Sequence, residues 1–115
     1  MNIESFREYC LSFSGVTEEF PFDENTLVFK VMGKMFALCD VDDFQSINLK
    51  CEPVKAIELR EEYPGLVQPG YHMNKKHWNT VSMQHHLPDD LIKEWIKDSY
   101  DLVVAKLAKR DREKL

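Results

Sequence analysis

The sequence predicts a single α+β domain, in which a mainly antiparallel meander sheet of about five strands is covered by three helices. The chain has 115 residues, of which 43% are hydrophobic and 11% aromatic, and this is enough for one core without metal or disulfides. Apolar residues recur at helical spacing near both ends, and they alternate with polar residues in between. We therefore expect one domain over residues 1–115, with residues 109–115 as a frayed tail.

Three segments carry helix signals. In residues 2–13 the apolar side chains fall three or four positions apart, so one helix face is apolar. Pro53 suits the first turn of a second helix, which should run to about Tyr63. The longest helix should follow Pro88, because two acids open it and basic residues close it, the order that the helix dipole favours.

Runs of β-branched and aromatic residues predict five strands: residues 17–22, 27–31, 34–39, 45–51 and 78–83. The Met32-Gly33 pair between two of these runs is typical of a tight hairpin, and Pro21 indicates an edge strand. The element order is then α-β-β-β-β-α-β-α. The period-2 alternation predicts one buried face and one solvent-facing side, with Lys30 on the latter.

The charge is unevenly distributed. The chain has a formal net charge of −5, which argues against a protein that coats DNA through charge alone. Residues 1–62 carry −7 and residues 89–115 are neutral, whereas residues 63–88 carry +2, contain no acid and hold all four histidines. Such a stretch is either an ordinary solvated loop and strand or a surface that binds an anion.

Catalytic and metal-binding patterns are absent. His72 and His77 are five apart, and His85 and His86 are adjacent, with no cysteine or carboxylate nearby to complete a zinc shell. The three cysteines form no CxxC pair, and no GxSxG, GxxxxGK[ST] or GxGxxG motif occurs. We expect a protein without enzymatic activity, metal or cofactor.

The compartment follows from the same inventory. An odd number of cysteines at wide spacing is typical of reduced thiols. The N-terminal residues include charged side chains and lack the apolar run of a signal peptide, and no stretch approaches the length of a membrane span. We expect a cytoplasmic, monomeric protein with no membrane contact.

The segment Pro69–Val81, PGYHMNKKHWNTV, makes the chain recognisable. Together with EFPF near residue 20, VFKV followed by GKMFA, and NLKC, it resembles the MmcQ/YjbR-like family over nearly the whole chain. The resemblance implies a CyaY-like (frataxin-like) fold and a DNA-binding label attached to a "double wing" of strands and loops. One departure is Asp23, where many relatives have glycine, and it adds an acid near the first wing.

The family motif maps onto Tyr71, His72, Asn74, Lys75, Lys76, His77, Trp78 and Asn79. In a DNA-binding protein, Lys75 and Lys76 would contact phosphates, and three polar motif side chains, His72, Asn74 and His77, would donate hydrogen bonds. Trp78 would either stack on an unpaired base or belong to the core. Lysines on or beside strands complete the candidate binding set: Lys30, Lys34 and Lys50.

Three functions remain open. The first is weak, salt-sensitive DNA binding, and the second is an interaction with an acidic protein or a small anionic ligand through the same surface. The third, metal handling of the frataxin type, rests on the thin acidic ridge of Glu4 and Glu8. Lysines that converge on one face would favour nucleic acid, and scattered lysines would favour a partner protein.

Overall fold

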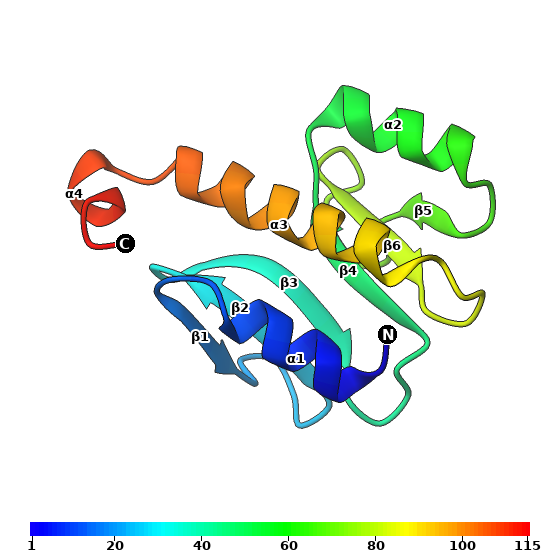
Figure 1. The fold of residues 1–115 in the computed structure, drawn as a ribbon, viewed down its shortest axis with the longest axis horizontal. Helices are drawn as coiled ribbons and strands as arrows, with labels where there is room; N and C mark the ends of the chain where they lie inside the picture. Colours follow the sequence, from blue (N-terminus) through cyan, green and yellow to red (C-terminus); the bar gives the residue numbers. More distant parts are fainter.

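The computed structural model describes residues 1–115 and contains one six-stranded sheet with four helices (Figure 1). Along the chain the elements are α1 (Ile3–Leu11), β1 (Val16–Glu19), β2 (Thr26–Val31), β3 (Lys34–Asp40), β4 (Ser46–Lys50), α2 (Pro53–Glu62), β5 (Val67–Pro69), β6 (Trp78–Ser82), α3 (Asp89–Ala105) and α4 (Lys109–Arg112). The strand order is β1-β2-β3-β4-β6-β5, and every neighbouring pair is antiparallel. The predicted α+β class is confirmed.

The sixth strand, β5, is absent from the sequence prediction. It has three residues, and its Pro69-Gly70 end is typical of a turn. It nevertheless pairs with β6 in the register Val67↔Val81. A proline is tolerated in β5 because this strand is the edge of the sheet, where one side of the backbone has no neighbour to bond.

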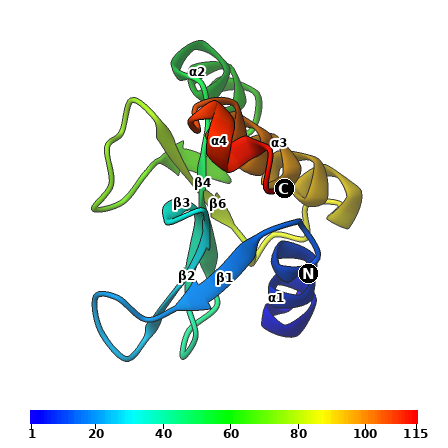
Figure 2. The same cartoon turned by 90° about the vertical axis from the view of Figure 1, so that its left-hand side faces the viewer.

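The three long helices cover the same face of the sheet. Phe6 of α1, Leu59 of α2 and Ile96 of α3 belong to one cluster of 20 buried residues that also contains Phe29 of β2. Figure 2 shows α1 and α3 together on one side of the strands. Because each helix has only one apolar stripe, burial against the sheet supplies most of its stability.

The opposite face, which we call the open face, is only partly exposed to solvent. Val28, Leu38 and Trp78 form a second buried cluster there, with Met35 and Met73 packed against it. The prediction of a fully solvent-facing side is therefore wrong at these positions. The reason is that the segment before β6 folds back over this face and brings Met73 onto the strands.

A β-bulge in β3 ties the sheet to α3. Phe29 pairs with Ala37 and Lys30 pairs with Met35, which leaves Phe36 without a partner residue. The buried Ser99 of α3 donates a hydrogen bond to the Phe36 carbonyl at 2.5 Å and accepts one from the Lys50 amide at 2.9 Å.

The C-terminal residues differ from the expected frayed tail. Residues 109–112 form α4, and Leu115 packs against the main core. Ser14 Oγ donates a hydrogen bond to the Leu115 carbonyl at 3.0 Å. None of the four helices combines the length and the apolar content needed to cross a bilayer.

Candidate nucleic-acid interface

Two loops flank the open face. Residues 20–25 connect β1 to β2, and residues 70–77 connect β5 to β6. Both project from the sheet on the side away from α1 and α3 (Figure 2). Between them the strands present short polar side chains, among them Thr80, whose hydroxyl lies 2.6 Å from Asn48 Oδ1. The strands of the open face thus form a floor, and the loops 20–25 and 70–77 form a wall on either side of it.

The loop 70–77 begins at a glycine that the packing requires. Gly70 donates its N–H to the Trp78 carbonyl at 2.8 Å, so the two chain segments run in close contact. A Cβ on Gly70 would lie 2.7 Å from the Trp78 Cβ and 3.0 Å from the Trp78 carbonyl oxygen. Asn74 closes the other end of the loop, because its carbonyl accepts from the amides of His77 and Trp78.

Arg60 of α2 anchors the same loop from the helix side. Its Nε donates to Asn79 Oδ1 at 2.7 Å, and a terminal guanidinium nitrogen donates to the carbonyls of Lys75 and Trp78. The planar fork of donors in arginine makes such simultaneous contacts possible. The loop is therefore held by a side chain from another element, which the sequence analysis did not identify.

Most of the predicted motif residues are accessible. The exposed ones are Tyr71, His72, Asn74, Lys75 and Lys76, and His77 is half-buried. Tyr71 is 70% exposed. Trp78 is only 6% exposed, because its ring packs on Val28 and Leu38. Of the two roles left open for Trp78, the core role is therefore the one that the structure supports.

Four of the five candidate lysines lie at one end of the sheet. Lys34 begins β3, Lys50 ends β4 opposite Trp78, and Lys75 and Lys76 lie in the loop before β6, separated from it by His77. Lys106, just after α3, joins them. Burial first, and then the charges of Lys106 and Lys34, lower the pKa of Lys50. We call these five residues the basic end.

The sequence does not identify Lys106 as a member of this cluster, because its position predicts only a basic residue in the last turn of a helix. Its contribution depends on where α3 ends relative to β3 and β4, which sequence spacing does not reveal. Lys30, by contrast, is one of the predicted binding residues, but its charge already has a partner within the protein. Its ammonium forms an ion pair with Glu19 across the β1–β2 pair, so little of its charge is available to a ligand.

The loop 20–25 has a different character. Phe22 is 63% exposed and Phe20 is 49% exposed. Asp23 accepts hydrogen bonds from the amides of Asn25 at 2.8 Å and Thr26 at 2.6 Å. These bonds lower the pKa of the Asp23 carboxyl, the Asn25 bond having the largest effect. Asp23 is thus ionised at neutral pH and disfavours a phosphate at this wing.

Two of the three cysteines are buried, and the histidines belong to no metal-binding cluster. Burial raises the pKa of the Cys10 thiol far above its usual range and that of Cys39 to about 12. Both thiols are therefore protonated and poor nucleophiles. No three side chains of His, Cys, Asp or Glu come together in a way that could hold a metal ion.

Known proteins are similar to this chain in both sequence and fold. The YjbR family model matches residues 11–102. The chain belongs to the YjbR family. It is 38% identical to the uncharacterized protein YbdF of Escherichia coli O157:H7, over 97% of this chain and 92% of that protein. With the uncharacterized protein YjbR of Escherichia coli K12 the identity is 31%, over 100% of this chain and 98% of that protein.

A solved structure agrees with the fold of this YjbR member. The crystal structure of protein DR2400 from Deinococcus radiodurans superposes with a TM-score of 0.91 at 39% identity, covering 98% of this chain and 86% of that one. The family membership predicted from the Pro69–Val81 segment is confirmed. The frataxin-like fold and DNA binding implied by that resemblance remain predictions.

Proposed function

We propose that the protein binds DNA, without catalysing a reaction, through the open face and the basic end. The observation that carries the proposal is that lysines from four separate segments lie at one end of the sheet, two of them within the longest acid-free stretch of the chain. Ammonium groups that neutralise phosphates supply most of the affinity of such an interface. Because only five lysines take part in a molecule of net charge −5, the binding is weak and salt-sensitive.

The flanking loops favour unpaired bases over a duplex. Phe20, Phe22 and Tyr71 are exposed aromatic side chains on the two walls of the open face, and base stacking on such rings is worth about 1–3 kcal/mol per base. A shallow polar groove of about 250 Å³ lies at the other end of the face. Its amide and hydroxyl side chains, such as Gln68 and Ser82, offer neutral donors and acceptors for base edges.

The proposal is tested with a labelled oligo(dT) in a fluorescence anisotropy titration. Binding at low salt should weaken as salt rises, with a log–log slope of about −0.7 for each phosphate neutralised. The double variant Lys75→Glu/Lys76→Glu should reduce affinity more than about tenfold and flatten this slope by about 1.4. Its melting temperature should stay close to that of the wild type, because both side chains are exposed.

A charge-matched control distinguishes direct contacts of Lys75 and Lys76 with DNA from the effect of the net charge of the protein. Lys93→Glu/Lys97→Glu changes the net charge equally but lies on α3, on the helix-covered side. It should weaken binding only at low salt, because charges more than a Debye length (about 10 Å at 0.1 M) away are screened. Equal losses in both double variants, or no binding by the wild type at low salt, would contradict the proposal.

The alternative, a small anionic ligand at the same surface, has its own signature. For DNA, affinity should rise from an oligonucleotide of about five to one of about fifteen nucleotides, the range of site sizes of single-strand binders. A saturable interaction that does not gain from length, and that inorganic pyrophosphate displaces, would instead favour the small anion and count against DNA.

A further inference from the structure

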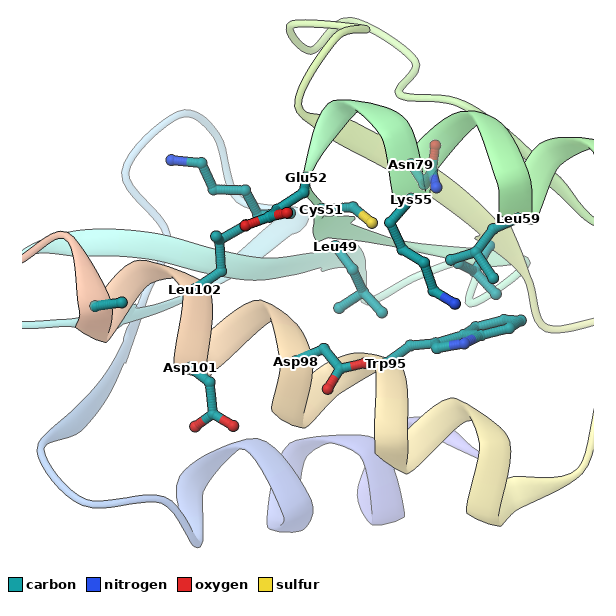
Figure 3. Close-up of a pocket in the computed structure, with 13 residues that line it drawn as sticks. Leu49, Cys51, Glu52, Lys55, Leu59, Asn79, Trp95, Asp98, Asp101 and Leu102 are labelled. Atoms are coloured by element: carbon teal, nitrogen blue, oxygen red, sulfur yellow. The ribbon is translucent and has the colours of Figure 1, made fainter.

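A groove lies on the other side of the molecule, between α2 and α3. Its volume is about 490 Å³, and its floor is formed by β4 and β6 (Figure 3). This volume falls in the range of about 300–1,000 Å³ that is typical of small-molecule sites. The groove is on the helix-covered side, away from the open face, and it shares Lys50 with the basic end.

The floor and walls of the groove are mostly apolar. Leu49 of β4, Leu59 of α2, Val81 of β6 and Trp95 of α3 line it, and they also belong to the main core. Figure 1 shows α2 and α3 as two separate helices, and these core side chains line the open space between them. Apolar surface that faces a concave site provides the affinity for the body of a ligand.

Five charged residues line this groove, and two of opposite sign lie on its two helical walls; the full set is Lys50, Glu52, Lys55, Asp98 and Asp101. Lys55 extends from α2 and Asp98 from α3 into the space between the two helices (Figure 3), and both residues are exposed to solvent. They form no ion pair, and Asp98 has no cationic partner within 4.0 Å. The neighbouring Asp101 is different, because it is paired with Lys97 at 2.6 Å.

The surroundings of Asp98 favour a cation. Partial burial, followed by the charges of Glu94 and Asp101, raises the pKa of the Asp98 carboxyl. The two acidic neighbours raise this pKa by more than Lys55 and Lys97 lower it. An ammonium group beside Asp98 would relieve this repulsion, whereas a ligand that carried only an ammonium group would meet Lys55 on the opposite wall.

We propose that the groove between α2 and α3 binds a small zwitterion with an apolar side chain, such as an apolar α-amino acid. The ammonium group lies against Asp98, the carboxylate lies against Lys55, and the side chain covers Leu49, Leu59 and Trp95. A ligand with both charges satisfies both walls at once, while a ligand with one charge leaves the other wall unpaired and partly desolvated.

Cys51 provides a direct readout of occupancy. Its sulfur points into the groove (Figure 3), and it is half-buried, whereas Cys10 and Cys39 are fully buried. Alkylation by N-ethylmaleimide should therefore modify Cys51 first. A ligand in the groove should slow this reaction by the fraction of protein that it occupies, about tenfold at ten times its Kd.

Three probes that share one aromatic ring distinguish the charges. L-phenylalanine carries both charges, phenethylamine only the ammonium group, and 3-phenylpropanoate only the carboxylate. L-phenylalanine should protect Cys51 at millimolar concentration, and each singly charged probe should bind about tenfold more weakly, because one charged contact is lost. Equal protection by phenethylamine and L-phenylalanine, or no protection at about 10 mM, would overturn the proposal.

Two variants test the walls separately. Lys55→Met and Asp98→Asn should each reduce the affinity for L-phenylalanine about tenfold, while Lys109→Met and Asp90→Asn, at exposed positions away from the groove, should not change it. Burial raises the pKa of the Cys51 thiol, and the charge of Lys55 offsets part of this rise, so each rate is compared with that of the same variant without ligand. Unchanged affinity in either wall variant would show that the groove binds by its apolar surface alone and would refute the proposal.

Discussion

The two loops beside the open face are held by different kinds of contact. Residues 20–25 are fixed locally, because Asp23 accepts the amides of residues two and three positions further along the chain. Residues 70–77 are fixed by distant partners. Arg60 of α2 binds their backbone, Thr80 of β6 accepts the Tyr71 amide at 3.0 Å, and Gly70 lies against Trp78.

This difference assigns the loops different roles in a binding surface. A loop secured by one exposed side chain can open without unfolding the domain, whereas a loop tied to a helix and a strand opens only with them. The lysines of the second loop are thus presented on a fixed backbone, which reduces the entropy lost on binding. The aromatic side chains of the first loop can adapt to a ligand.

The substitution Gly70→Ala should have the largest effect, because it acts on the contact that distinguishes the second loop. Its new Cβ would meet the Trp78 Cβ and carbonyl at distances that neither group can relieve by a rotamer change. We expect a loss of about 3 kcal/mol in the free energy of unfolding, measured by urea denaturation. A loss below about 1 kcal/mol would show that the loop is not packed as described.

Gly65→Ala is the matched control. Gly65 has a φ of +79°, and a Cβ there would have no neighbour within 4 Å. The change should destabilise by about 1 kcal/mol through backbone strain alone. Amide exchange in the loop 70–77 should remain unchanged in this variant and should accelerate in Gly70→Ala.

Arg60→Ala should have the next largest effect. It removes the charged donor that binds Asn79 and the loop backbone, and it leaves the nearly buried Asn79 Oδ1 without this partner. We expect a loss of about 2 kcal/mol in the free energy of unfolding together with faster amide exchange in residues 70–77. Arg60→Lys should recover only part of both, because an ammonium group cannot reproduce the fork of contacts.

Sequence periodicity identified the parts of this fold that depend on local patterns. The helical stripe containing Phe6 and the strand alternation around Phe29 both describe how a single element meets the core. The bulge at Phe36 and the short strand β5 depend on pairing between distant segments, which no window of the sequence contains. For the same reason, the prediction located the second loop by its composition but missed Arg60.

The candidate lysines show the same division. Their presence on the strands was predictable, but their neighbours were not. Lys30 is paired with Glu19 because β1 and β2 place the two residues on one face, and Lys106 joins the basic end because of where α3 ends. Trp78 belongs to the core because the loop that precedes it folds over the sheet.

The smallest effect concerns the charge that holds the first loop. The pKa of the Asp23 carboxyl is lowered by its bonds to the Asn25 and Thr26 amides. A group whose pKa is lower in the folded state stabilises the protein above its ordinary value of about 4, and this stabilisation disappears as the pH falls through the folded pKa. Asp23→Asn keeps an acceptor oxygen without the charge, so its Tm should lie up to about 2 °C below that of the wild type at pH 7. The two melting temperatures should converge as the pH falls below about 4 and through the lowered pKa of Asp23. A Tm difference that persists at the lowest pH, or a carboxyl NMR titration of Asp23 at its ordinary midpoint, would show that the loop is held by something other than this ionised side chain.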